Sequence, residues 1–174
     1  MVPPSFDRAR IEQLLAFFAD RLDGEWLLIG GGAAAAWFSP SRTTEDLDLV
    51  GLLGSQDERM ALMELASEAA VPIEAVNSAG AFFLRQIEGW RDEMVLLRRG
   101  TRATIYRPSA TLFLLLKIER LTATDLEDCL ALIDHCKISL ERFDADRVRA
   151  RIGELASTDD IALSERRQLL STRL

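Results

Sequence analysis

Residues 25–51 join a short apolar segment, three glycines, an alanine run and a second apolar segment that carries two aspartates. The first segment, EWLLIG, predicts a strand that ends in the glycines. The next, GGAAAAWF, predicts a short helix, because alanine is the best helix former and is unremarkable in strands. A polar loop, SPSRTTE, leads to DLDLVG, whose alternation of acidic and aliphatic residues has the period of a strand. This order of strand, helix and strand predicts a mixed α/β core.

The sequence before and after residues 25–51 predicts further helices and strands of this core. Residues 5–22 have helical periodicity, with Ser5 as the expected N-cap. Ser55 and Glu58 have the spacing of a capping box, which predicts the start of another helix. The segment EMVLLRRGTRATIYR predicts a hairpin that turns near Gly100.

From Pro108 onward every segment predicts helix, and Thr124 with Glu127 has the spacing of a second capping box. The fold class is therefore predicted to be α+β, with a mixed sheet, flanking helices and a helical end. We expect an α/β core over residues 1–107 and a helical C-terminal segment over residues 108–174 that packs on the core.

The composition argues against a disordered chain, a large nucleic-acid footprint and a membrane span. An apolar content of 48% supports a packed core, and a net charge of −7 does not favour a large nucleic-acid footprint. Cys129 and Cys136 are seven residues apart and are expected to be small core residues in a reducing compartment. The longest apolar run, ATLFLLL, is too short to cross a bilayer. We therefore expect a cytoplasmic protein with no membrane partner.

The pair Asp46 and Asp48 predicts a metal clamp. Residues i and i+2 of a strand project to the same face, within roughly 7 Å of each other. Two carboxylates at that separation repel unless water or a cation lies between them, and Mg²⁺ prefers oxygen ligands. The alternative is a solvated strand face, on which two acids cost little.

The glycines at 30–32 predict an anion site. A strand that runs into glycines and then a helix offers backbone N–H groups at a helix N-terminus, and glycine lets a phosphate approach closely. The dinucleotide fingerprint does not fit, because Ala35 stands where its third glycine is expected, and no P-loop Gly-Lys-Ser/Thr is present. The alternative is a tight turn before a closely packed alanine helix.

The segment LIGGGAAAAWFSPSRTTEDLDLV resembles the signature of the nucleotidyltransferase superfamily typified by DNA polymerase β. In that signature a glycine pair at a helix start precedes Asp-x-Asp on a strand. The form RTTEDLD is similar to small bacterial members, namely minimal nucleotidyltransferases and relatives of the AbiEii-type toxin. Downstream, LLLKIERLTATDLEDCLALI resembles their helical segment. The resemblance extends over roughly residues 25–136.

The resemblance implies a role for each residue of the motif. Gly30 and Gly31 would hold a nucleoside triphosphate, and Asp46 and Asp48 would bind Mg²⁺ or Mn²⁺. A third carboxylate on a neighbouring strand would complete the metal site and help activate the acceptor hydroxyl.

Glu74 is the candidate for that third carboxylate. It lies in PIEAV, which predicts a strand on which Glu74 faces away from Ile73 and Ala75. The family commonly has an aspartate there, and Asp92 or Glu93 could take the same role.

Two cations are candidates for binding the triphosphate. Arg42 could reach a phosphate, or it could pair with Glu45 in the loop. Lys117 could neutralise triphosphate charge, or it could extend to the surface from the end of an apolar helix. Asp125 and Asp128 fall in the first turn of the next helix, where the helix dipole alone favours acids.

These implications predict a metal-dependent nucleotidyltransferase. It would move a nucleoside monophosphate from a triphosphate, such as ATP, to an acceptor hydroxyl of RNA, protein or a small molecule. The resemblance also implies a bacterial toxin–antitoxin or phage-defence setting, with a cognate antitoxin as a partner. The alternative is a nucleotidyltransferase-like module that binds a nucleotide or a protein without catalysis.

Overall fold

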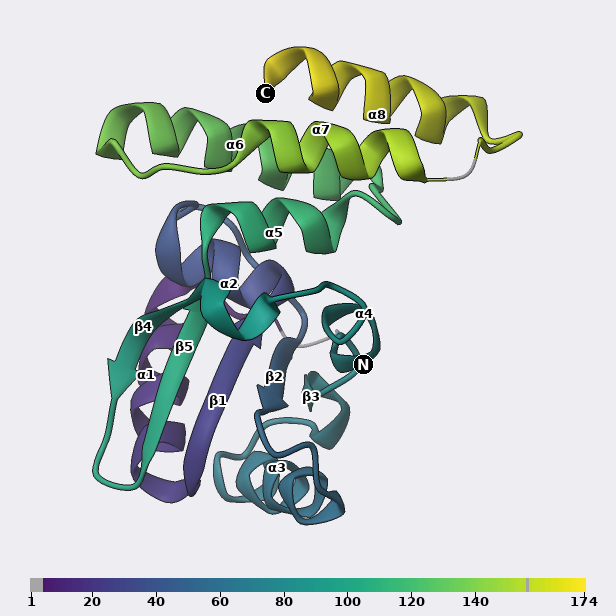
Figure 1. Cartoon of the computed structure of the whole chain (residues 1–174). Helices are drawn as coiled ribbons and strands as arrows, with labels where there is room; N and C mark the ends of the chain where they lie inside the picture. Colours follow the sequence, from purple (N-terminus) through teal and green to yellow (C-terminus); the bar gives the residue numbers. More distant parts are fainter. Residues whose placement is uncertain (1–4, 156) are drawn as a thin grey trace. The chain divides into compact units, whose positions relative to one another are not determined.

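The computed structural model describes residues 5–155 and 157–174, and over these residues it contains eight α-helices and one five-stranded mixed sheet (Figure 1). The α+β class is confirmed. The chain forms two compact units: unit 1 comprises residues 1–86 and 94–108, and unit 2 comprises residues 87–93 and 109–174. No helix of the described residues combines the length and the apolar content that crossing a membrane requires.

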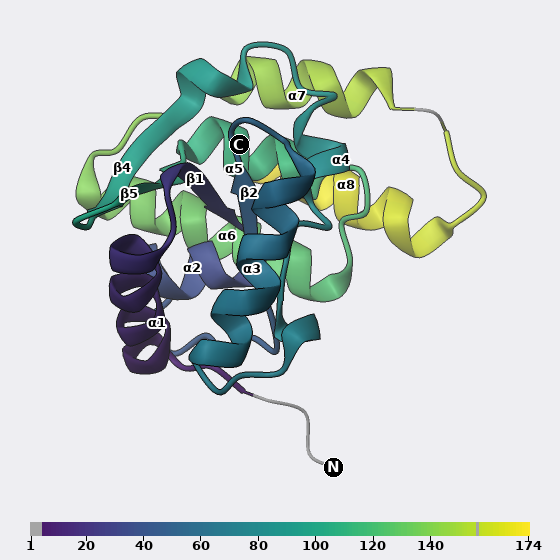
Figure 2. The same cartoon turned by 90° about the horizontal axis from the view of Figure 1, so that it is seen from below.

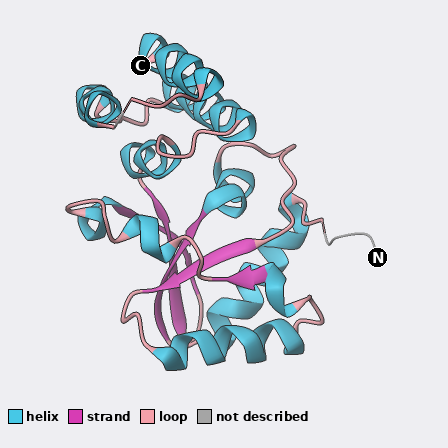
Figure 3. Cartoon of the chain, turned by 90° about the vertical axis from the view of Figure 1, so that its right-hand side faces the viewer, coloured by secondary structure: helices cyan, strands magenta, loops and turns pink. Residues whose placement is uncertain are grey.

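Unit 1 contains the sheet, with its strands drawn in magenta in Figure 3. Its elements are, in chain order, α1 Arg8–Arg21, β1 Gly24–Ile29, α2 Gly30–Trp37, β2 Leu47–Gly51, α3 Gln56–Glu68, the 3-10 helix η1 Ile73–Ala75, β3 Val76–Asn77, α4 Ala81–Leu84, β4 Met94–Arg99 and β5 Ala103–Pro108. The predicted strand–helix–strand order over 25–51 and the predicted hairpin are confirmed.

The sheet has the strand order β3-β2-β1-β5-β4. β1 pairs antiparallel with β2 and parallel with β5, so it is the central strand. β1 is accordingly buried along its last four residues. The predicted alternation in β2 is confirmed, since Leu47 and Leu49 are fully buried and Asp48 between them is half-buried.

The helical periodicity predicted for residues 5–22 is confirmed in α1. α1 buries Ile11, Leu14, Leu15 and Phe18 and contacts β5 and α2. α1 and α3 are joined by an ion pair between Arg21 and Glu68, 3.2 Å from nitrogen to oxygen. Figure 2 shows these two helices from below.

Unit 2 is helical. It contains the 3-10 helix η2 Trp90–Glu93, α5 Ala110–Lys117, α6 Ala123–Ser139, α7 Ala145–Glu154 and α8 Ile161–Arg173. α5 packs against α6 and α7, and α6 packs against α8. Cys129 and Cys136 are free and buried on α6, which confirms them as core residues.

Two predicted helix starts are wrong. The N-cap of α1 is Asp7, whose carboxylate accepts from the backbone N–H of Arg10, and Ser5 lies outside the helix. The capping box of α6 is formed by Thr122 and Asp125, two residues before the predicted pair. The sequence TATDLE offers the same spacing twice, and in the earlier frame the carboxylate of Asp125 also contacts the buried Lys117 and the exposed Arg120.

Candidate functional site

Gly30 links β1 directly to α2 without an intervening loop. Its φ of +70° lies in the left-handed region, which glycine adopts without a steric penalty. A Cβ at Gly30 would lie 2.8 Å from Oδ2 of Asp48, so the carboxylate of Asp48 lies directly against the first residue of α2. Among the described residues, no side chain caps this helix. The start of α2 is therefore a turn of backbone N–H groups with a carboxylate beside it.

Gly31 lies under the loop that precedes β2. A Cβ on Gly31 would lie 2.9 Å from Oγ1 of Thr44 and 3.4 Å from Nη2 of Arg42. Thr44 is anchored by two backbone hydrogen bonds with Phe6, of 2.8 and 3.1 Å, and is buried. Only a residue without a side chain allows this loop to approach the helix so closely.

Thr44 connects the loop to the first acid. Its hydroxyl lies 3.1 Å from the backbone oxygen and 3.3 Å from Oδ1 of Asp46. Asp46 is exposed one residue before β2, and Asp48 is half-buried in β2. Sequence reasoning did not single out Thr44, although it lies two residues before Asp46, within reach of a short hydroxyl side chain.

These contacts gather five of the seven predicted site residues in unit 1: Gly30, Gly31, Arg42, Asp46 and Asp48. The guanidinium of Arg42 also donates to the backbone oxygen of Thr43. The helix N-terminus carries partial positive charge, and the carboxylate of Asp48 already lies against it. A second anion, such as a phosphate, would meet repulsion from Asp48 unless a cation lay between them.

The donor atoms suit a hard divalent cation, since carboxylate and hydroxyl oxygens are the ligands that Mg²⁺ prefers. Asp46 and Thr44 supply such oxygens 3.3 Å apart, and Asp48 supplies another against Gly30. This site has only two carboxylates among its candidate ligands. Within residues 5–155 and 157–174, no group of three His, Cys, Asp or Glu side chains is placed to hold a metal ion.

The predicted strand around Glu74 is wrong. Ile73–Ala75 forms a turn of 3-10 helix, closed by a 2.9 Å hydrogen bond from the N–H of Ala75 to the oxygen of Pro72. Glu74 is exposed on this turn. The short strand begins only at Val76, and the residue that pairs with Asp48 is Asn77. The residue of β3 in register with Asp48 is therefore an amide, and Glu74, the predicted third carboxylate, lies outside this strand.

Asn77 is hydrogen-bonded within its own segment, and Asp92 and Glu93, the two other candidates for the third carboxylate, lie in unit 2. Oδ1 of Asn77 accepts a 2.9 Å hydrogen bond from the N–H of Ala79. Asp92 is exposed on η2 of unit 2. Glu93 accepts from the hydroxyl of Ser109 and pairs with Arg147 at 2.8 Å, all within unit 2.

Lys117, the seventh predicted residue, is buried in unit 2. Its side chain is 8% exposed, and Nζ lies 2.7 Å from Oδ1 of Asp125 and 3.2 Å from Oδ2 of Asp128. The predicted extension of Lys117 to the surface is therefore wrong. Asp125 and Asp128 are also buried and pair with Lys117, so the helix dipole alone does not account for these acids. To neutralise a triphosphate, Lys117 would have to leave two carboxylates.

The charge of Asp125 is stabilised by its partners. Burial by itself would raise its pKa, but hydrogen bonds from Arg120 and Lys117, the charge of Lys117 and the N–H of Thr122 together hold the pKa well below its usual range. Arg120 adds contacts of 3.0 and 3.2 Å to the two oxygens. Asp125 therefore stays ionised inside unit 2, where it joins the start of α6 to the end of α5.

Comparison with protein-family models, with curated proteins and with solved structures gave no match.

Proposed function

We propose that unit 1 binds a nucleoside triphosphate together with Mg²⁺, and that the chain is a metal-dependent nucleotidyltransferase. One observation carries the proposal: the carboxylate of Asp48 lies against Gly30, at the uncapped start of a glycine-rich helix. Backbone N–H groups that could receive an anion therefore lie beside an acidic side chain that could bind a cation. A carboxylate and a phosphate can bind next to each other when a metal ion bridges them.

The residues of this chain would divide the work as follows. The backbone N–H groups of Gly31 and Gly32 would receive phosphate oxygens, with Arg42 beside them. Asp46 and Asp48 would hold the cation, and Thr44 would orient Asp46. Bound Mg²⁺ supplies charge neutralisation at the transferring phosphoryl group and lowers the pKa of a bound hydroxyl.

The reaction we propose is transfer of a nucleoside monophosphate to an acceptor hydroxyl, with release of pyrophosphate. The acceptor classes are RNA, protein and small molecules. The resemblance of the RTTEDLD segment to AbiEii-type relatives supports a toxin–antitoxin or phage-defence setting with a cognate antitoxin.

A second candidate is a nucleotide-binding module without catalysis. The observation that favours it is Asn77, which pairs with Asp48 where a third carboxylate would complete the metal site. A neutral amide adds no negative charge to a second metal position, so such a site would bind a metal–nucleotide complex and not activate an acceptor.

Binding is tested by thermal unfolding with ATP, with Mg²⁺ and with the two together. Mg²⁺ and ATP together should raise Tm, because a ligand that binds only the folded state stabilises it by mass action. ATP alone should give little change, since Asp46 and Asp48 repel it. Asp46→Asn with Asp48→Asn should remove the rise. The matched control, Asp57→Asn with Glu64→Gln, removes two exposed acids of α3 and should keep it.

Transfer is tested with α-³²P-labelled triphosphates and cell extract. Label that reaches an acceptor, and is lost in the Asp46/Asp48 variant, identifies the enzyme. Binding without label transfer identifies the second candidate. Asn77→Asp would place a carboxylate beside Asp48 and keep the oxygen that accepts from Ala79, so metal affinity should rise. An unchanged metal affinity in Asn77→Asp would place the metal away from this strand pair.

A further inference from the structure

A pocket of about 280 Å³ lies in unit 1 between α3 and the segment around α4. Its polar side chains come from Ser55, Glu58, Arg59, Ser78 and Arg85, and Gly54 also lines it. None of the proposed triphosphate and metal residues lines it. The pocket is therefore separate from the proposed triphosphate site, and the kind of ligand that it could bind is inferred from its own lining residues.

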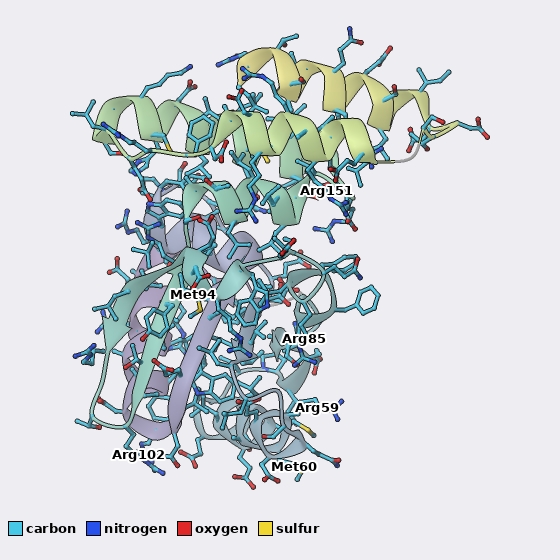
Figure 4. All side chains as sticks on the ribbon, in the orientation of Figure 1. Arg59, Met60, Arg85, Met94, Arg102 and Arg151 are labelled. Atoms are coloured by element: carbon cyan, nitrogen blue, oxygen red, sulfur yellow. The ribbon has the colours of Figure 1, made fainter. Side chains whose placement is uncertain are left out.

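Two guanidinium groups distinguish this pocket. Arg59 comes from α3, and Arg85 follows the last residue of α4; Figure 4 labels both, on the same side of unit 1. Among the described residues, neither guanidinium makes a hydrogen bond or an ion pair. Several other arginines of unit 1 are paired, such as Arg21 with Glu68. In a chain with 28 acidic side chains against 21 basic ones, two unpaired arginines in one pocket indicate an anionic ligand.

The one acidic side chain in the pocket lining, Glu58, is hydrogen-bonded to the backbone. The two carboxylate oxygens of Glu58 accept from the backbone N–H groups of Leu53, at 3.0 Å, and Ser55, at 2.9 Å. Glu58 thereby closes the capping box of α3. Its charge lowers the net positive charge of the pocket to about one, and it does not form an ion pair with either arginine.

The backbone makes room for Arg85. Gly54 has a φ of +69°, and a Cβ on Gly54 would lie 2.3 Å from Nη2 of Arg85. The guanidinium therefore lies directly over the Gly54 backbone. Ser55 and Ser78 add two hydroxyls to the lining of the pocket. The Ser55 oxygen accepts from the N–H of Glu58, which leaves its O–H free to donate.

We propose that this pocket binds the phosphate group of a small phosphorylated molecule. Arg59 and Arg85 would each present two N–H donors to the phosphate oxygens, and Ser55 and Ser78 would donate through their hydroxyls. The arginine fork matches phosphate geometry, and a phosphate dianion suits two cations better than a single carboxylate does. A volume of about 280 Å³ lies at the small end of ligand pockets, which favours a small molecule over a polymer.

The test is a titration of ¹⁵N-labelled protein with inorganic phosphate and, separately, with ribose 5-phosphate, in buffer without divalent metal. The arginine Nε–Hε signals of Arg59 and Arg85 and the amide signals of Ser55 and Ser78 should shift together. Removing both arginines, as Arg59→Ala with Arg85→Ala, should weaken binding by at least about tenfold, since hydrogen bonds to charged groups are the strong ones. Arg59→Lys with Arg85→Lys keeps the charge and should recover only part of the affinity.

Arg8→Ala is the matched control, because it removes an exposed arginine of unit 1 that does not line the pocket. It should bind phosphate like the parent. Stronger binding of ribose 5-phosphate than of inorganic phosphate would identify a phosphorylated metabolite as the ligand, and equal binding would identify free phosphate. Shifts confined to Gly31 and Gly32, or no shift with either probe, would overturn the proposal. These outcomes do not depend on whether the chain transfers nucleotides.

Discussion

Gly30 meets two requirements at one position, and a single added methyl group would violate both. Its φ of +70° disfavours any residue with a Cβ, and the Cβ itself would lie 2.8 Å from the carboxylate of Asp48. Gly24 shares only the first requirement. Its φ is +85°, but a Cβ there would meet no atom within 4 Å. The two glycines therefore separate backbone strain from contact with the proposed metal ligand.

Gly30→Ala should lower the free energy of unfolding by more than Gly24→Ala does. Each substitution carries a backbone cost of about 1–2 kcal/mol for the left-handed conformation, and Gly30→Ala also displaces Asp48. Urea unfolding measures both costs. Gly24→Ala should keep the rise in Tm with Mg²⁺ and ATP, whereas Gly30→Ala should lose it. Retention of the full rise in Gly30→Ala would show that Asp48 and the helix start do not act together.

At the scale of elements, the junction between α5 and α6 depends on one buried carboxylate. Asp125 belongs to the capping box of α6 and also contacts Lys117 and Arg120. Local helix geometry and buried charge pairing therefore coincide in one side chain. Removing its charge would weaken both at once.

Asp125→Asn should destabilise unit 2 by about 3 kcal/mol, because removing one partner of a buried ion pair leaves the other charge poorly compensated. The folded pKa of Asp125 is lowered below its unfolded value of about 3.9. Its contribution to stability is therefore fully present above about pH 4 and is lost as the pH falls through the lower, folded pKa.

Equilibrium unfolding of unit 2 between neutral and acidic pH measures this dependence. The loss of stability with acidification should be shallower in Asp125→Asn than in the parent. Asp134→Asn is the control, because Asp134 is an exposed acid of the same helix that pairs with Lys137 and Arg173 at the surface. It should cost less than about 1 kcal/mol. Equal costs at Asp125 and Asp134 would contradict the structural role of the buried cluster.

Elements with strong local signals were predictable from the sequence. The capping box of Ser55 and Glu58, the alanine-rich α2 and the alternation in β2 all depend on residues a few positions apart. The segment PIEAV was not, because its alternation competes with a 3-10 turn that begins after Pro72. Only Val76 and Asn77 find a partner in β2, and pairing with a distant strand has no local signature.

At the scale of the whole molecule, the candidate site was predictable where chain neighbours form it. Asp46, Asp48 and the glycines lie within twenty residues, and the structure brings them together. Lys117 was open to two interpretations because its partners lie eight and eleven residues later. An ammonium at the end of an apolar helix looks the same in sequence whether it reaches solvent or meets a buried acid. Only the return of the chain in α6 decides between them.

That return also buries both cysteines, which makes thiol labelling a measure of unfolding in unit 2. Burial raises the pKa of the Cys129 thiol well above its usual range, and the thiolate is the reactive form. At neutral pH the folded protein should therefore react with a thiol reagent orders of magnitude more slowly than the protein in denaturant, where two thiols should be counted. Cys136→Ala isolates Cys129, and its labelling rate should rise with denaturant along the loss of helical dichroism. Asp125→Asn should raise that rate further, because it weakens the same helix. Fast labelling of Cys129 in the native parent would mean that α6 opens without the cooperative loss of unit 2, and that the buried cluster of Lys117, Asp125 and Asp128 does not hold it closed.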